Sequence, residues 1–261
     1  MAEETLTVKK STLQWLVVAV VVLVIGFGIG RFTAPTGNAV QNQAQAQQPA
    51  IQPSQPSQPS APSQPTQPSA PTQPSKVSLT IPSYAPYQGQ ASAGLNIVEF
   101  ADYQCPFCER YYSQTEPQVT ADYVTTGKAK YYFLDFAFLG PDSTTLGDGA
   151  WCANDQGKYW EYHDYVYQHQ GQENSGWATA DNVKQMAGNI TGLDVAKFST
   201  CLDAKTYESR VGTLTQLGQG VGVTGTPSFL IGSDAKGYTL VVGAQPYATI
   251  KAAIDQQLSA A

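Results

Sequence analysis

Residues 13–30, LQWLVVAVVVLVIGFGIG, form an almost unbroken apolar run in which Gln14 is the one amide side chain. At about 1.5 Å per residue, a helix of this length spans most of a hydrocarbon core about 30 Å thick. Two lysines precede the run, and after Arg31 no charged side chain appears before Lys76. The positive-inside rule therefore predicts a single transmembrane helix, with residues 1–12 in the cytoplasm and the later chain on the other side.

A cleaved signal peptide is the alternative to an anchor, because GNA at 37–39 resembles a cleavage site. The length of the apolar run and the arginine directly after it favour an uncleaved anchor. Both interpretations place the later chain outside the cytoplasm. We therefore expect a single-pass protein of the cell membrane, with its main domain on the periplasmic or cell-surface side.

Residues 31–76 are rich in Pro, Gln, Ser and Ala, and a proline falls at every third position from Pro53 to Pro74. Three residues per turn is the period of polyproline II. At about 3.1 Å per residue, the periodic part alone extends roughly 70 Å. We expect a disordered, semi-rigid linker that holds the next domain away from the membrane.

The remaining residues, 77–261, are enough for one domain with a substantial core. They carry 18 acidic side chains against 10 lysines and arginines, without a basic cluster, so we expect no nucleic-acid partner. All four cysteines of the chain lie in this domain. An even number of cysteines outside the cytoplasm is typical of disulfide-bonded proteins.

Apolar and aromatic runs predict two central strands near the start of this domain. LNIVEFA at 95–101 is short, apolar and partly β-branched, and AKYYFLDFAFL at 129–139 is aromatic. Between them we expect a helix that begins at Pro106 and is kinked at Pro117. Strand, helix and strand at this spacing form a βαβ unit with a parallel pair of strands.

A helical block follows, and we expect it to be an insertion over about 142–222. Thr179 and Asp194 are placed to be N-caps, and Gly188 is placed to end a helix. The helical segments predicted in the block are 151–169, 179–188, 193–204 and 207–219.

The pattern returns to strands at 226–232 and 238–244, with a short polar segment between them that suits a hairpin loop. A last helix is predicted over 246–261, with a proline in its first turn. The predicted fold class is therefore α/β, with the order βαβ, helical insertion, ββα. A transmembrane helix and a proline-rich linker are expected to precede this domain.

Cys105 and Cys108 form a Cys-x-x-Cys pair, which is compatible with half a zinc site, a structural disulfide or a redox-active disulfide. Cys105 stands where the strand is expected to end and the helix to begin, so the helix N-terminus favours its thiolate. Cys108 lies one turn further along the helix. We expect Cys105 to be the exposed, attacking sulfur with a lowered pKa, and Cys108 to be the buried, resolving sulfur.

Two other features accompany the cysteine pair. Glu99 lies in the apolar strand, where a buried carboxyl with a raised pKa would exchange a proton with Cys108. On spacing alone, an edge position facing water fits Glu99 equally well. The Thr226–Pro227 bond opens a later strand and is compatible with a cis peptide, and the missing N–H of Pro227 leaves the Thr226 backbone free to pair with a substrate peptide.

These features together resemble the DsbA-like branch of the thioredoxin superfamily. CPFC follows VEF, GTP precedes the penultimate strand, and the order βαβ, insertion, ββα covers nearly all of 77–261. CANDQGKYWEYHDYVY at 152–167 is similar to the insertion of the membrane-anchored and Com1-like members.

The resemblance implies a thiol–disulfide oxidoreductase in which Cys105 attacks and Cys108 resolves. It implies that Glu99 occupies the buried-acid position of the family and relays a proton. It further implies that Pro227 is the cis-proline facing the disulfide, with Thr226 directly before it.

Phe107 departs from the strongly oxidising members of the family, which have a histidine in this position between the cysteines. A phenylalanine side chain cannot donate a hydrogen bond to the thiolate. We therefore expect a less extreme thiolate pKa and a somewhat lower reduction potential, which leaves the direction of electron transfer open.

Cys152 and Cys201 are 49 positions apart in two of the predicted helices. If these helices pack together, a disulfide between them adds about 4 kcal/mol in the chain-entropy description, and two separate buried thiols are the alternative. The resemblance favours the disulfide, because some relatives carry an extra one in the insertion. A zinc site is not expected, since there is one Cys-x-x-Cys pair and His163 and His169 are six apart.

Tyr103, Phe107 and Tyr111 lie close to the cysteine pair in the sequence. They fit an apolar rim for unfolded substrates and fit ordinary core packing equally well.

The sequence thus predicts an enzyme that oxidises cysteine pairs in unfolded or partly folded exported proteins. The disulfide of Cys105 and Cys108 would be its redox centre, without a separate cofactor or metal. The resemblance implies reoxidation by a membrane partner of the DsbB or VKOR type. A reductase or isomerase of the same fold is the first alternative, and a binding or chaperone module with a structural disulfide is the second.

Overall fold

A computed structural model describes residues 76–259 of the chain. The cytoplasmic N-terminus, the membrane anchor at 13–30 and nearly all of the proline-rich linker predicted from the sequence lie outside the described residues. Within 76–259, no helix combines the length and the apolar character needed to cross a membrane.

A six-stranded sheet runs through the described part of the chain, in the order β1-β6-β5-β3-β4-β2. Its strands are β1 (Lys76–Val77), β2 (Tyr87–Gln88), β3 (Leu95–Ala101), β4 (Ala129–Asp135), β5 (Ser228–Ser233) and β6 (Gly237–Val242). β3 pairs in parallel with β4, and every other pair of neighbouring strands is antiparallel. Because β3 lies at the centre of the sheet, all of its residues are buried.

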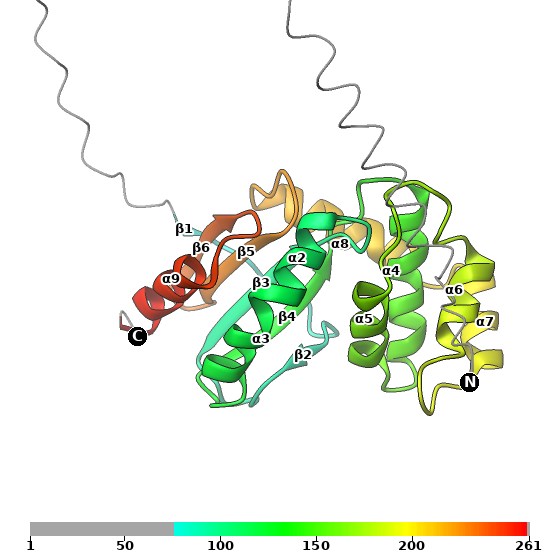
Figure 1. Ribbon diagram of the computed structural model, residues 1–261. Helices are drawn as coiled ribbons and strands as arrows, with labels where there is room; N and C mark the ends of the chain where they lie inside the picture. The colour runs from blue at the N-terminus through cyan, green and yellow to red at the C-terminus, as the bar shows by residue number, and fades with distance from the viewer. Residues whose placement is uncertain (1–75, 260–261) are drawn as a thin grey trace, which may run out of the picture. The chain divides into compact units, whose positions relative to one another are not determined.

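Helices cover both faces of this sheet. One face is covered by α2 (Pro106–Gln114), α3 (Glu116–Val119), the π-helical turn η1 (Thr120–Val124) and α9 (Tyr247–Ser259), and α8 (Glu208–Gly220) lies on the opposite face (Figure 1). On the first face, the Tyr111 ring of α2 packs on Phe229 of β5 with ring centroids 4.5 Å apart. The sheet therefore has an apolar core on each side.

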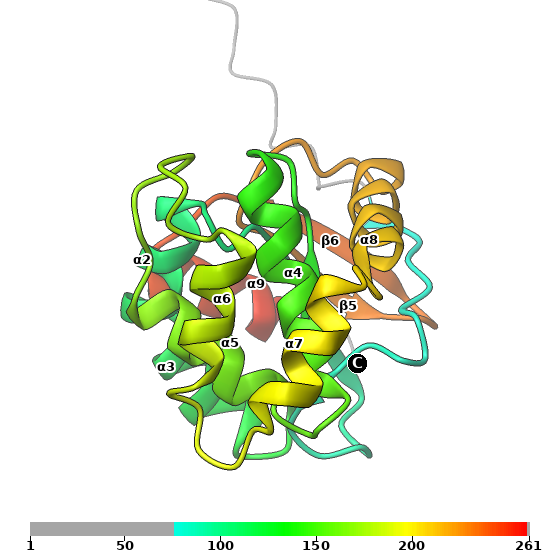
Figure 2. The ribbon, with the colours of Figure 1, turned by 90° about the vertical axis from the view of Figure 1, so that its right-hand side faces the viewer.

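The helical insertion stands beside the sheet, next to α2 and α3 (Figures 1 and 2). It contains α4 (Pro141–Asn154), α5 (Tyr159–Gln168), α6 (Ala180–Ala187) and α7 (Val195–Asp203), and it leads into α8. The order βαβ, insertion, ββα predicted from the sequence is confirmed.

The predicted caps and kink are also present. The Thr179 hydroxyl accepts from the Asn182 N–H at 3.4 Å, and the Asp194 carboxylate accepts from two N–H groups of the first turn of α7. Pro117 lies at the start of α3, and Thr115 separates this short helix from α2. Local side-chain chemistry therefore sets these helix ends.

Two local predictions were wrong, and two short strands were not anticipated. The single helix expected over 151–169 is broken into α4 and α5, because Gly157 adopts a positive φ of 68° in the turn between them. The strand expected to reach residue 139 ends at Asp135, because the next residues turn toward the end of β3. The two-residue strands β1 and β2 were not expected, since two residues carry no periodic pattern.

Candidate active site

Cys105 lies at the junction of β3 and α2. It is the N-cap residue of α2, with extended backbone angles, and Pro106 follows it at the first helical position. The Cys108 and Glu109 N–H groups donate to the Cys105 carbonyl at 3.0 and 3.2 Å, which begins the helix. The Cys105 side chain therefore stands among the unpaired N–H groups of the helix N-terminus, as the sequence predicts.

Both cysteines are free thiols, and both are buried. Cys105 is 5% exposed and Cys108 is 1% exposed, so the prediction of an exposed Cys105 is wrong for this structure. The reason is the neighbouring loop before β5, where the Thr226 carbonyl oxygen accepts a hydrogen bond from the Cys105 thiol at 3.4 Å. A substrate must therefore approach Cys105 past the loop that contains Thr226.

The two thiols nevertheless differ strongly in acidity. A hydrogen bond from the Cys108 thiol, together with the N–H groups of Cys108 and Phe107, lowers the pKa of Cys105 to about 6 against the opposing effect of burial. Burial raises the pKa of Cys108 well above its usual range, and the interaction with Cys105 raises it further. At neutral pH the pair is therefore a Cys105 thiolate beside a Cys108 thiol.

Glu99 is buried in the central strand and does not face water. The Tyr131 hydroxyl donates a hydrogen bond to its Oε2 atom. Burial raises the pKa of Glu99 to about 8, against the effect of the Tyr131 hydrogen bond, and the Cys105 charge adds to the rise. Glu99 is therefore an acid that is protonated at neutral pH and is electrostatically coupled to both cysteines.

Thr226 and Pro227 lie in the loop before β5 and are joined by a cis peptide bond. The hydrogen bond to Cys105 described above goes to Thr226, so this dipeptide lies directly against the attacking sulfur. The structure thus brings together all five residues predicted for the site: Glu99, Cys105, Cys108, Thr226 and Pro227.

The loop before α2 is held by polar side chains that the sequence did not single out. The Gln170 side-chain amide, from the segment after α5, donates to the carbonyls of Tyr103 and Cys105 at 2.9 and 3.1 Å. The buried Asp102 carboxylate accepts from the N–H groups of Gln104 at 2.8 Å and Phe138 at 3.0 Å. These bonds tie the cysteine loop to the insertion and to the end of β4.

The apolar rim proposed from the sequence is reduced to one side chain. Phe107 is 54% exposed, and the Arg110 guanidinium lies 5.0 Å from its ring centroid. Tyr103 and Tyr111 are fully buried core residues, so the rim interpretation is wrong for both. Their rings pack on Phe133 and Phe229, respectively, because each residue faces the sheet.

Cys152 and Cys201 form a disulfide between α4 and α7. The bond lies inside the insertion and closes a loop of 49 positions. It is separate from the free pair of Cys105 and Cys108.

Both histidines lie in or next to α5. His163 is buried among aromatic rings, with its Nδ1 atom 2.9 Å from Asp164, whereas His169 is exposed. In the part of the chain that the structure describes, no three His, Cys, Asp or Glu side chains are grouped as metal ligands.

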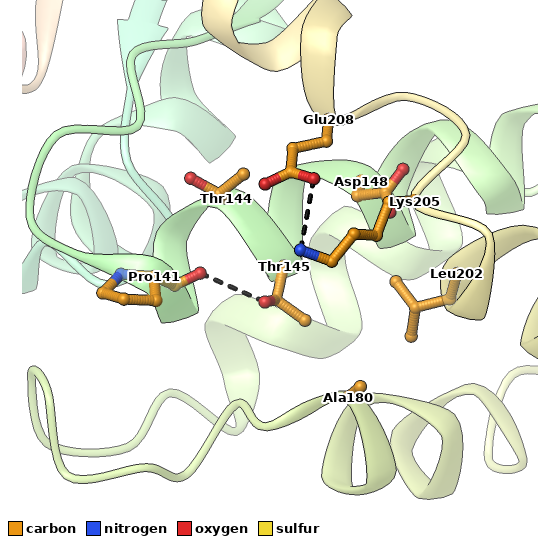
Figure 3. Close-up of a pocket in the computed structure, with 8 residues that line it drawn as sticks. All are labelled: Pro141, Thr144, Thr145, Asp148, Ala180, Leu202, Lys205 and Glu208. Carbon is orange, nitrogen blue, oxygen red and sulfur yellow. Dashed lines mark hydrogen bonds and ion pairs between the residues drawn. The ribbon is translucent and has the colours of Figure 1, made fainter.

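A cavity of about 400 Å³ lies in the insertion (Figure 3). Its wall includes an ion pair between Lys205 and Glu208, 3.3 Å apart, and the Asp148 carboxylate, which accepts from the Tyr207 N–H. None of the residues predicted for the cysteine site lines it. The cavity is therefore separate from the dithiol.

Comparison with known proteins agrees with this fold. The sequence profile of the thioredoxin family matches residues 83–256, more than half of the chain. The chain therefore belongs to the thioredoxin family, and it is a DsbA-like thiol–disulfide oxidoreductase.

One similar protein is the "Probable disulfide bond formation protein D" of Bacillus cereus, which is 29% identical over 175 residues, covering 65% of this chain and 77% of the relative. Oxidised BdbD from Bacillus subtilis superposes with a TM-score of 0.64 at 22% identity, covering 72% of this chain and all of BdbD. Wolbachia pipientis alpha-DsbA1 superposes with a TM-score of 0.61 at 19% identity, covering 70% and 94% of the two chains. These two structures show the shared fold.

Proposed function

We propose that this chain introduces disulfides into exported proteins through the Cys105-Pro106-Phe107-Cys108 motif. The observation that carries the proposal is the place of Cys105 at the N-terminus of α2 and against the cis Thr226–Pro227 dipeptide, where its pKa is lowered while that of Cys108 is raised. A stabilised Cys105 thiolate favours the reduced form of the pair, which makes the disulfide form a better oxidant. At pH 7 a pKa lowered to about 6 favours the reduced form about tenfold, which corresponds to roughly 30 mV for a two-electron couple.

The proposed reaction passes two electrons from the substrate to the cysteine pair. A substrate thiolate attacks the Cys105 sulfur, the Cys105–Cys108 bond breaks, and Cys108 leaves with the electron pair and takes the proton of Glu99. The second substrate thiolate then attacks the substrate sulfur of the mixed disulfide. The bond to Cys105 breaks, Cys105 leaves as a thiolate, and the substrate carries a new disulfide.

Thr226 is proposed to position the substrate during this exchange. Its carbonyl oxygen already contacts the attacking sulfur, and it precedes Pro227, which has no N–H to donate. An extended substrate peptide next to this loop would bring its cysteine to Cys105.

The direction of transfer is tested by the reduction potential of the pair, measured by equilibration with glutathione buffers. A potential well above about −180 mV, the value of protein disulfide isomerase, supports the oxidase. A potential near about −270 mV, as in thioredoxin, contradicts it and supports the reductase alternative. Substitution Cys108→Ala should also trap client proteins as mixed disulfides, and Cys105→Ala should trap none.

We further propose that the domain works outside the cytoplasm, anchored by residues 13–30 and held away from the bilayer by residues 31–76. The apolar run, the basic residues around it and the proline period support this location. A membrane protein of the DsbB or VKOR type would reoxidise the pair. Protease treatment of cells stripped of their wall and any outer membrane should digest the domain while a cytoplasmic marker survives, and full protection of the domain would contradict this location.

A further inference from the structure

Glu116 is a second buried acid on the sheet face that carries Glu99. It is the first residue of α3, directly before Pro117 in the break between α2 and α3, and it is 6% exposed. Within residues 76–259, its Oε2 atom and the Tyr111 hydroxyl are buried without a hydrogen-bond partner. A carboxyl group in such a place costs folding free energy, so a functional reason for it is worth seeking.

Tyr131 connects the two acids. In the parallel pairing of β3 and β4, Tyr131 is opposite Ile97, two positions before Glu99 in β3, so both side chains lie on the same sheet face. The Tyr131 hydroxyl donates to Glu99, and it also interacts with the carboxyl of Glu116, where it lowers the pKa. The Tyr131 hydroxyl is therefore bonded to Glu99 and also acts on the acidity of Glu116.

The charge environment keeps both acids protonated near neutral pH. Burial raises the pKa of Glu116 well above its usual range, and the charges of Glu99 on β3 and Asp164 on α5 raise it further. Burial also raises the pKa of Tyr111 on α2 well above its usual range, and further tyrosines face the two acids: Tyr112 beside Glu116, and Tyr159 and Tyr167 beside Glu99. The cluster thus contains exchangeable protons and no cation.

Glu116 also reaches a surface groove, whereas Glu99 does not. The groove has a volume of about 580 Å³ and is lined by residues of α2, α3, η1 and α5, with Gln88 of β2. Tyr112, Asp164 and Gln168 form its wall beside Glu116. The series of side chains from Glu99 through Tyr131 to Glu116 therefore ends at the wall of this groove.

We infer that Tyr131 and Glu116 form a proton relay that exchanges the proton of Glu99 with solvent in this groove. When Cys108 leaves as a thiolate, Glu99 gives it a proton. Tyr131 then passes its hydroxyl proton to Glu99 and takes the proton of Glu116, and a proton from solvent restores Glu116. In the reverse reaction Cys108 returns its proton by the same route. Tyr131 and Glu116 are positioning residues, since they act through Glu99.

The relay rests on the proposed function, because it operates only if Cys105 and Cys108 carry out thiol–disulfide exchange. Stopped-flow mixing of the oxidised protein with dithiothreitol near pH 7 tests the exchange and the relay separately. Thiolate absorbance at 240 nm follows Cys105, and an indicator dye follows protons. Oxidation of dithiothreitol by the disulfide releases two protons. In the wild type the relay takes up one proton at the same time, so the dye should report a net release of one proton in step with the absorbance. In Tyr131→Phe and Glu116→Gln, release of both protons should precede an uptake slower by about tenfold or more.

Two variants serve as matched controls. Tyr112→Phe removes a hydroxyl in the same groove that is bonded to Gln168, and Glu161→Gln removes an exposed carboxylate paired with Lys158. Both should keep the single proton phase. A single phase in Tyr131→Phe and Glu116→Gln as well would overturn the relay, whereas a wild type without the absorbance change would instead overturn the exchange activity.

Time-resolved infrared spectra of the wild type after mixing with dithiothreitol give a readout that needs no folded variant. The relay requires the carboxylic acid bands of both Glu99 and Glu116 to change transiently and then return, because each acid gives up a proton that is afterwards restored. A transient change in one band alone contradicts it.

Discussion

Cys105 owes its acidity mainly to Cys108, and this dependence can be tested with one substitution. Because the hydrogen bond from Cys108 is the largest contribution that lowers the pKa of Cys105 to about 6, Cys108→Ala should raise this pKa by about 1 unit or more. The rate of reaction with iodoacetamide, measured against pH, gives the pKa in each protein. An unchanged midpoint near 6 in the variant would show that the backbone N–H groups alone stabilise the thiolate.

Phe107 is a second residue that tunes the pair. Its side chain is exposed, and its contribution to the Cys105 thiolate is through its N–H group. Phe107→His adds a side chain that donates a hydrogen bond and becomes cationic at low pH, so we expect a Cys105 pKa below 6 and a more positive reduction potential.

Iodoacetamide titration and glutathione equilibration measure these two quantities, and Phe107→Leu is the matched apolar control. If the leucine variant shifts both quantities as much as the histidine variant does, the effect comes from the loss of the aromatic ring instead.

At the scale of elements, the disulfide between Cys152 and Cys201 joins two helices of the insertion. Replacing both cysteines with alanine should lower the free energy of unfolding by about 4 kcal/mol, as expected for a closed loop of this length. The pKa of Cys105 should stay near 6, because neither of these cysteines contributes to it. Urea unfolding measures the free energy of unfolding, and iodoacetamide titration measures the pKa of Cys105. A shifted Cys105 pKa would show that the insertion is coupled to the dithiol through this bond.

The elements also show which parts of the fold a sequence reveals. The caps at Thr179 and Asp194 and the helix start at Pro106 were predictable, because each depends on residues within one turn. The contacts of Gln170 with the cysteine loop were not, since they join residues 65 or more positions apart without a pattern in the sequence. Tyr103 was ambiguous because a tyrosine fits both a rim and a core, and only the packing on Phe133 distinguishes them.

The candidate site shows the same difference between features set by short motifs and features set by contacts between distant residues. Cys105, Cys108 and Pro227 are recognisable from short motifs. The spacing of Glu99 fitted a buried position and an edge position equally well, and only the central place of β3 in the sheet decides for burial. Glu116 was missed because a glutamate in a surface helix ordinarily faces water, and only the break at Pro117 and the packing beneath it bury its carboxyl.

For the whole molecule, several buried acids act in the same direction on stability. Burial raises the pKa of Glu99 to about 8 and of Asp135 to about 7, although Asp135 also accepts a hydrogen bond from the Trp151 ring at 2.8 Å. Burial raises the pKa of Asp148 to about 6. His163 acts in the opposite direction, because burial lowers its pKa below 6.5.

These shifts predict that the domain is more stable near pH 5 than near pH 8. Glu99 is still protonated in the folded state at pH values where the unfolded chain has already lost this proton. Its contribution is therefore complete below about pH 4.5 and is lost as the pH rises to about 8, and Asp135 behaves alike up to about pH 7. Below pH 6.5 the buried His163 stays neutral while the unfolded chain binds a proton there, which removes part of this gain in folding stability.

Urea unfolding of the disulfide form, in which Cys105 and Cys108 do not titrate, should show the free energy of unfolding falling by a few kcal/mol between pH 5 and pH 8. Glu99→Gln should reduce this fall, since glutamine does not titrate and fits the same space. Glu161→Gln, at an exposed position, should leave the fall unchanged. A free energy of unfolding that rises over this interval in the wild type would mean that Glu99 and Asp135 are ionised in the folded protein, and Glu99 would then lack the proton that Cys108 is expected to take.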